Sequence, residues 1–217
     1  MKYYIAENIE SPYGDYGDII FTGYIQTFYW EKVEHTYNNR KVFKDEMRDL
    51  EIAELIRTGP YVPEIYIVSS DAFAMTEDFM ENLMRSDLKG IDNLKPTIKK
   101  QIVNLPWKNW TQEDWENHIE TLYEPEDSIE RGEHDESLAL SMPNVFYFKP
   151  ITTESELSIQ EDNGVERYFL NKAPTHGLDV FMASNMLWFI VSENFKKFVD
   201  EAAPNIFSFS EVVYGNN

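Results

Sequence analysis

The chain has 217 residues, of which 42% are hydrophobic and 15% aromatic, and its 39 acidic and 19 basic side chains give a net charge of −20. This length suits one large domain, and the composition is far from that of a disordered chain. The sequence contains no cysteine, which excludes disulfides, thiol nucleophiles and thiolate-bound metals. The negative charge argues against nucleic acid and anionic membranes as partners, because both would repel it. It is compatible with a basic protein partner or with a generic acidic surface.

The N-terminal residues do not have the pattern expected of a secretory signal. The first ten residues contain no basic region before an apolar segment, and no later run approaches the ~20 apolar residues of a membrane span. We therefore expect a reducing, cytoplasmic compartment. The organisation expected is a single domain over 1–217, or two lobes over 1–123 and 138–217 joined by an acidic segment at 124–137.

The first third of the chain predicts several strands and one helix. Alternating or continuous apolar residues indicate strands at 2–6, 19–21, 24–30 and 63–69. A polar turn is expected over 34–40. A helix is expected over 42–57, because its apolar residues recur at helical spacing and Gly59-Pro60 would end it.

The most regular stretch runs from Leu178 to Tyr214 and predicts strand, tight turn, strand, helix and strand. Leu187 to Val191 is a run of five large apolar residues, which is typical of a buried strand. Ser192 stands at the N-cap position of the helix, and Pro204 would end it.

An earlier segment repeats this pattern. Thr76-Glu77-Asp78-Phe79 and Ser192-Glu193-Asn194-Phe195 share the order hydroxyl, acid, Asp or Asn, and Phe. The strand at 63–69 precedes the first copy, and 96–103 is the returning strand expected after it. Two interpretations are open: a true structural repeat, or two instances of a common helix start.

Beyond the acidic segment the chain returns to strands, at 145–148, 157–162 and 165–170. The last two flank Asn163-Gly164, the dipeptide that most favours a tight hairpin. The whole pattern predicts an α+β fold, with mixed or antiparallel sheets, a few covering helices and two pseudo-repeated strand-helix-strand units.

Half of the net charge lies in one eighth of the chain. From Thr111 to Ser137 there are eleven acidic residues and one arginine, a net charge of −10 in 27 residues. Thr111 and Asp114 have capping-box spacing and predict a helix to about Tyr123, followed by a polar loop over 126–137. The glutamates recur at three- and four-residue steps and so share one side of that helix. The five lysines between 89 and 108 would neutralise part of this charge.

Two interpretations of the acidic segment are open: a solvated face with a mobile loop, or an acidic docking surface. Like charges at this density repel one another, so a compensating benefit is expected.

Motifs that carry chemistry are absent from the sequence. It has no Walker loop, dinucleotide fingerprint, HExxH or nucleophile elbow. The segment 133–136 places His134 among three carboxylates, a set that suits a divalent cation, but a polar loop organises ligands poorly. No catalytic residue, cofactor or metal is therefore predicted. His118, between Glu116 and Glu120, is expected to be a surface residue whose charged form the acids favour.

Leu187-Trp188-Phe189-Ile190-Val191-Ser192-Glu193-Asn194-Phe195-Lys196, followed after a helix by Ile206-Phe207-Ser208-Phe209, resembles the end of bacterial immunity proteins of polymorphic toxin systems. The unit at Ile67-Val68-Ser69-Ser70 is similar to the internal one of those proteins. The resemblance covers about a third of the chain. It implies a cytoplasmic, non-enzymatic antitoxin that binds a cognate toxin domain, but it gives no counterpart for the acidic segment.

The charge pattern and the resemblance predict the same function. A basic toxin, such as a nuclease, would be attracted to an acidic surface, and aromatic residues beside the acids would anchor it. The residues predicted to contact the toxin are Trp110, Glu113, Asp114, Trp115, Glu116, Glu120, Tyr123, Glu126, Asp127 and Glu130. The alternatives are a non-catalytic adaptor or structural protein of a phage or secretion system, and an enzyme whose site is assembled from distant residues.

Overall fold

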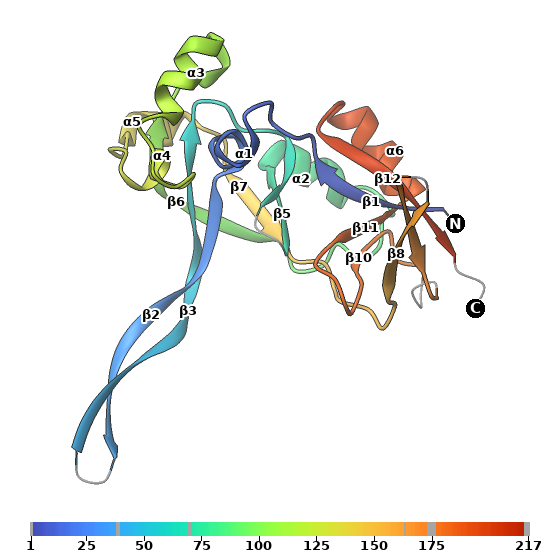
Figure 1. Cartoon of the computed structure of the whole chain (residues 1–217), viewed down its shortest axis with the longest axis horizontal. Helices are drawn as coiled ribbons and strands as arrows, with labels where there is room; N and C mark the ends of the chain where they lie inside the picture. The colour runs from blue at the N-terminus through green and yellow to red at the C-terminus, as the bar shows by residue number, and fades with distance from the viewer. Residues whose placement is uncertain (1, 38–39, 69–70, 163, 173–176, 215–217) are drawn as a thin grey trace.

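The computed structural model describes residues 2–37, 40–68, 71–162, 164–172 and 177–214. In them, twelve strands form two six-stranded mixed sheets, and six α-helices accompany the sheets (Figure 1). The predicted α+β fold is confirmed. No helix in the described part of the chain is long and apolar enough to cross a membrane.

The first sheet holds the N-terminal strand and the last five strands. Its order is β10 (Val180–Met182), β11 (Phe189–Ser192), β1 (Tyr3–Asn8), β12 (Phe207–Tyr214), β9 (Val165–Leu170) and β8 (Leu157–Asp162). The second sheet has the order β2 (Tyr24–Tyr37), β3 (Arg40–Gly59), β6 (Lys95–Asn104), β7 (Val145–Phe148), β5 (Ala72–Thr76) and β4 (Ile65–Val68).

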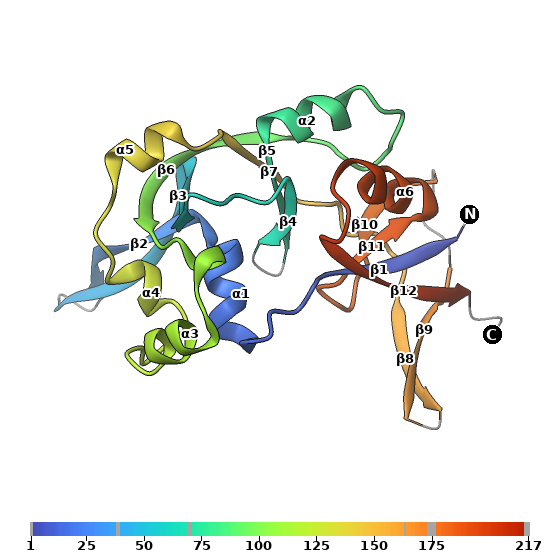
Figure 2. The ribbon, with the colours of Figure 1, turned by 90° about the horizontal axis from the view of Figure 1, so that it is seen from above.

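The helices are short. They are α1 (Gly14–Thr22), α2 (Glu77–Met84), α3 (Gln112–Ile119), α4 (Asp127–Glu130), α5 (Glu136–Ser141) and α6 (Glu193–Ala202), with one 3₁₀ turn, η1, at Trp107–Asn109. Figure 2 shows α3, α4 and α5 at one end of the molecule and α6 beside the strands of the first sheet.

The two sheets have the same topology, so the structural repeat is real. In each, an antiparallel pair (β4–β5 or β10–β11) leads into a helix (α2 or α6) and then a strand (β6 or β12) two places away. The strand between them, β7 or β1, is antiparallel to both of its neighbours. On its far side β6 or β12 pairs in parallel with a hairpin, β2–β3 or β8–β9.

The repeated helices begin at the predicted caps. The hydroxyl of Thr76 accepts a hydrogen bond from the N–H of Phe79 at 3.5 Å, and that of Ser192 accepts one from Phe195 at 3.2 Å. Three residues before each cap lie Phe73 and Phe189, whose ring centroids are 4.6 Å apart in the core that both sheets share. Equivalent positions of the two repeats therefore meet at the centre of the molecule.

The helix predicted over 42–57 is wrong: these residues belong to β3. β3 pairs with β2 from Tyr37↔Arg40 to Tyr24↔Ile56, and from Ala53 onward it also pairs with β6. Hydrogen bonds to strands distant in sequence outweigh the local helical spacing of its apolar residues. β2 runs to Tyr37, so most of the turn predicted over 34–40 is strand. Positions 38–39 of that turn, position 69 of the predicted strand at 63–69 and position 163 of the predicted hairpin turn lie outside the described residues.

Two further predictions are wrong. Residues 19–21 belong to α1, because Ile20 is buried on that helix and the N–H of Gly23 closes its last turn onto the carbonyl of Ile19. The polar loop predicted over 126–137 contains α4 and the start of α5, which Ile129 and Ala139 hold against β6 and its neighbours.

Strand pairing crosses the predicted lobe boundary in both directions. β1, from the first lobe, lies between β11 and β12, while β7, from the second lobe, lies between β5 and β6. The side-chain amide of Asn8 also links the sheets, because it donates to the carbonyl of Ile67 and accepts from its N–H, at 2.8 and 2.9 Å. Whether the chain behaves as one domain or as two lobes stays a prediction.

Candidate partner-binding surface

α3 begins at the predicted capping box. The hydroxyl of Thr111 accepts from the N–H of Asp114 at 3.2 Å, and the carboxylate of Asp114 accepts from the N–H of Thr111 at 2.8 Å. These hydrogen bonds from Thr111 hold the pKa of Asp114 below its ordinary value. Asp114 therefore fixes the start of the helix, and its carboxylate is already engaged.

Trp115 anchors α3 to the rest of the protein. Its ring stacks on that of Tyr13 at 4.4 Å and contacts those of Trp110 at 5.0 Å and Trp107 at 6.0 Å. Only 7% of Trp115 is exposed, so little of its ring is available to a partner, and its contact with one stays a prediction. Its size and planarity are used inside the protein, where it supports the surface above it.

α3 ends at Ile119, four residues before the predicted end near Tyr123. What we call the acidic ridge consists of Glu113 and Glu116 on the side of α3 away from Trp115, Glu120 at its C-cap and Glu124 in the turn that follows. All four are exposed, and within the described part of the chain no ion pair joins any of them to a cation. Among the residues that the structure describes, the one hydrogen-bond partner of their side chains is the amide of Gln112, which donates to Glu116 at 2.7 Å. The ridge is therefore an uncompensated negative surface.

The nearby lysines do not neutralise it. Lys99 donates to the carbonyls of Ala139 and Met142 at 2.6 and 2.5 Å, Lys100 pairs with Glu54, and the ammonium of Lys108 lies 3.0 Å from the centroid of the Tyr61 ring. The expected internal neutralisation is thus wrong for these three residues.

Beyond the ridge, Asp127 is structural. It is buried, it accepts the N–H groups of Tyr123 at 2.8 Å and Glu124 at 3.1 Å, and it pairs with Arg131 at 2.7 Å. Although burial acts in the opposite direction, these partners hold the pKa of Asp127 below its ordinary value. Its carboxylate is therefore engaged within the protein, and its contact with a partner stays a prediction. The turn that it closes leaves the Tyr123 side chain 81% exposed beside the ridge.

The remaining predicted residues lie around this turn. Glu126 is half-buried, and Glu130 is exposed and accepts from the Tyr24 hydroxyl at 3.2 Å. Burial and the negative charge of Glu130 raise the pKa of Tyr24 to about 12. Trp110 is half-buried at the foot of α3. The structure thus gathers Trp110, Glu113, Glu116, Glu120, Tyr123 and Glu130 on and around α3.

Neither histidine of this region is free. His118 is half-buried, 4.9 Å from the Trp110 ring and 3.3 Å from the Ser128 hydroxyl, and burial lowers its pKa. Its expected charging by the neighbouring acids is therefore wrong. The Nδ1 atom of His134 accepts from the N–H of Ile102 at 2.9 Å, and its Nε2 atom lies 3.0 Å from Glu136. Among the described residues no group of three or more His, Asp or Glu side chains is arranged to hold a metal.

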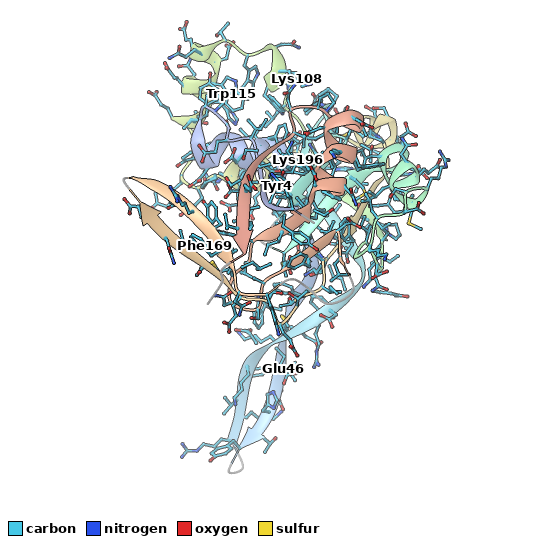
Figure 3. All side chains as sticks on the ribbon, turned by 90° about the vertical axis from the view of Figure 1, so that its right-hand side faces the viewer. Tyr4, Glu46, Lys108, Trp115, Phe169 and Lys196 are labelled. Carbon is cyan, nitrogen blue, oxygen red and sulfur yellow. The ribbon has the colours of Figure 1, made fainter. Side chains whose placement is uncertain are left out.

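A cleft of about 420 Å³ opens beside the foot of α3. Its walls are mainly aromatic, formed by Tyr13, Phe21, Tyr61, Trp107, Trp110 and Trp115. The charged side chains that line it are those of Glu10, Asp18 and Lys108. Burial raises the pKa of Asp18, whose carboxylate accepts from the N–H of Ser11 at 2.9 Å. In Figure 3, Lys108 and Trp115 lie at the same end of the molecule.

Two walls of this cleft are held by an arginine that the sequence pattern does not reveal. Arg57 is fully buried. Its guanidinium donates to the carbonyls of Phe21 and Tyr61, at 2.9 and 2.8 Å, and to the Tyr66 hydroxyl at 2.8 Å, while Nε donates to the carbonyl of Thr58 at 2.9 Å. Neutral acceptors therefore satisfy the cation in place of a carboxylate.

Comparisons with family models, with curated proteins and with solved structures gave no match to this chain.

Proposed function

We propose that this protein is a non-catalytic inhibitor of the immunity-protein kind, which acts in the bacterial cytoplasm by binding a basic toxin domain. The observation that carries the proposal is the acidic ridge. Four exposed glutamates follow one another from α3 into the turn after it, and no cation compensates them within the described chain. An arrangement that costs stability in the free protein gains from a partner that supplies the missing positive charge.

The rigid attachment of α3 to the rest of the protein supports the same function. The capping box and the stack of Trp115 on Tyr13 fix α3 before any partner arrives, so little ordering entropy is lost on binding. Tyr123, exposed next to Glu124, offers an aromatic side chain of the kind that dominates interface energetics.

The aromatic cleft adds a second means of recognising a basic partner. Lysine and arginine side chains bind over aromatic rings, and Lys108 already does so over Tyr61 at the edge of the cleft. A basic side chain of the toxin would find the rings of Trp107 and Trp110 and the carboxylate of Asp18 together there. Trp110 and Trp115, which line the cleft, lie at the foot of α3 and on it, so the cleft and the ridge are close enough for one partner to cover both.

The first test uses co-expression. The product of the adjacent reading frame is expressed alone and with this protein, and the growth of the host is compared. Relief of toxicity together with a co-purifying complex supports inhibition by binding, and a harmless neighbour that does not bind contradicts it.

The second test isolates the ridge. The triple variant Glu113→Gln, Glu116→Gln and Glu120→Gln should associate with the toxin at least tenfold more slowly at low salt, with a weaker dependence on ionic strength. A matched control, Asp87→Asn, Asp92→Asn and Glu201→Gln, removes the same charge from exposed positions elsewhere. Equal effects of the two triple variants would mean that net charge, and not the ridge, attracts the toxin.

A further inference from the structure

The aromatic cleft lies where the two sheets meet. From the first sheet, Ile9 after β1 and Ile206 before β12 line it, and the N–H of Ile9 donates to the carbonyl of Ile206 at 3.2 Å. From the second sheet, Tyr61 after β3 and Trp107 after β6 line it. Ligand sites favour such junctions between structural units, and a volume of about 420 Å³ is at the small end of their range. The cleft therefore suits one side chain or one small molecule.

The loop before α1 fixes the acidic wall of the cleft. The N–H of Ser11 donates to the carboxylate of Asp18 at 2.9 Å, and the hydroxyl of Ser11 accepts from the N–H of Tyr13 at 3.1 Å. The N–H of Gly14 then closes the turn onto the carbonyl of Ser11 at 3.1 Å. These hydrogen bonds position Tyr13 and Asp18 before a ligand arrives, which lowers the entropy lost on binding.

The carboxylate of Asp18 has unused capacity. One of its oxygens accepts from Ser11, and among the described residues no hydrogen bond or ion pair engages the other oxygen, nor does a cation pair with Glu10. Asp18 is half-buried, and burial together with the negative charges of Asp15 and Glu10 raises its pKa. A bound cation would remove this unfavourable state.

The aromatic wall also favours a cation. The ammonium of Lys108 already lies 3.0 Å from the centroid of the Tyr61 ring. The rings of Tyr13, Trp107 and Trp110 line the same cleft, and in the described part of the chain no cation lies over them. Tryptophan gives the strongest cation–ring attraction of the aromatic side chains. The cleft thus holds one internal cation and has rings for another.

The two walls together favour one kind of cation. A quaternary ammonium binds over aromatic rings but has no N–H to donate to Asp18. The ammonium of a lysine can donate, but it is compact and strongly hydrated. A guanidinium is planar and more weakly hydrated, and it can stack on a ring while its N–H groups donate in the plane to a carboxylate.

Given the function proposed above, on which this step rests, we propose that the cleft is a guanidinium site and that its occupant is an arginine side chain of the basic toxin. The guanidinium stacks on the aromatic wall and donates to the free oxygen of Asp18, while Glu10 adds a second negative charge. The cleft and the acidic ridge then act at different stages. Exposed glutamates speed association from a distance, whereas a desolvated charge pair slows dissociation.

The first test uses the purified full chain without the toxin. N-acetyl-arginine N-methylamide is titrated into the protein, and the fluorescence of the tryptophans that line the cleft is followed. We expect a dissociation constant of about 1 mM, as suits so small a ligand. The matched lysine compound and the neutral citrulline compound should bind at least about fivefold more weakly. An arginine compound that does not bind, or a citrulline compound that binds equally well, overturns the guanidinium site.

Two matched substitutions locate the site. Asp18→Asn keeps an oxygen for the N–H of Ser11 but removes the charge, so it should weaken binding of the arginine compound about tenfold. Asp15→Asn removes the same charge from an exposed position of α1 that does not line the cleft, and it should leave binding unchanged. Lys108→Gln removes the competing internal cation and should tighten binding. Equal effects of the two aspartate variants, or weaker binding by Lys108→Gln, overturn the assignment.

The toxin complex tests the occupant. Asp18→Asn should release the toxin about tenfold faster, with the association rate and its salt dependence as in the wild type. The triple variant of the ridge should show the converse. An unchanged dissociation rate overturns the assignment of the cleft to an arginine of the toxin. If no toxin binds the wild type, the proposed function fails with it, whereas the titration of this chain alone still decides whether the cleft binds a guanidinium.

Discussion

Arg57→Met tests whether a buried cation without a carboxylate holds the cleft together. Four hydrogen bonds from the guanidinium are lost, and at about 1.5 kcal/mol for each bond from a charged donor they contribute ~6 kcal/mol. Removing the cation also removes its burial cost, several kcal/mol for one ion, so we expect a net loss near ~3 kcal/mol. Urea unfolding followed by tryptophan fluorescence measures this loss, since Trp107, Trp110 and Trp115 are in or beside the cleft.

Two further variants separate the causes. Arg57→Lys keeps the charge but loses the planar fork that reaches Phe21 and Tyr61 together, so it should be at least as destabilised as Arg57→Met. Arg48→Met removes an arginine that is 45% exposed and ion-paired on the extension of β2–β3, and it should leave the urea midpoint nearly unchanged, because exposed ion pairs contribute little to stability. The reasoning fails if Arg57→Met unfolds at the wild-type urea concentration, or if Arg57→Lys is as stable as the wild type.

Three other substitutions have clear expectations. Trp115→Ala should cost ~3–5 kcal/mol in urea unfolding and weaken the near-ultraviolet circular dichroism of the tryptophan cluster, because it removes the buried ring that α3 rests on. Asp18→Asn should raise the thermal stability at pH 7. Burial raises the pKa of Asp18 in the folded protein, so the folded state loses stability relative to the unfolded state as the pH rises above the ordinary value of 3.8. At pH 3 the carboxyl is protonated in both states, so thermal unfolding of the variant should show no gain there. Gly90→Ala should lower the free energy of unfolding in urea by more than ~1 kcal/mol, since Gly90 has φ +90° and an added Cβ would lie 2.3 Å from the carbonyl oxygen of Val180. Gly164→Ala is the control, because Gly164 has φ +78° but open space around it, so that variant measures the cost of the backbone conformation alone.

Local signals in the sequence were sufficient where a feature depends on neighbouring residues. The caps at Thr76, Thr111 and Ser192 were predictable because each hydroxyl meets an N–H three residues away. The match between the first and last of these caps also indicated the repeat, which the strand order confirms.

Features that depend on distant partners were not predictable from local patterns. β3 has apolar residues at helical spacing, yet its partners in β2 and β6 make it a strand. Arg57 looks like any surface arginine until the carbonyl of Phe21, 36 residues earlier, reaches its guanidinium. Asp127 was counted among the free acids because its burial follows from the way the turn folds back at Tyr123.

The duplication distinguishes what the fold requires from what has been added to it. Both repeats build a complete six-stranded sheet, so an element present in one and missing from the other is unnecessary for the sheet. Three such elements exist in the described chain, and all accompany the second sheet: α1 before β2, the extension of β2–β3 over residues 28–49, and the segment with η1, α3, α4 and α5 between β6 and β7.

Two of these additions also carry unusual surfaces. The extension of β2–β3 over residues 28–49 has no net charge and exposes Phe28, Trp30, Phe43 and Met47, whereas the region of α3 presents uncompensated glutamates. The two surfaces lie at opposite ends of the second sheet (Figure 1), so they can be tested separately. Trp30→Glu on the extension should leave association with the toxin unchanged, whereas the triple variant Glu113→Gln, Glu116→Gln and Glu120→Gln should slow it, because only the ridge is proposed to attract the toxin. Slower association in the Trp30→Glu variant would place the toxin on the extension instead.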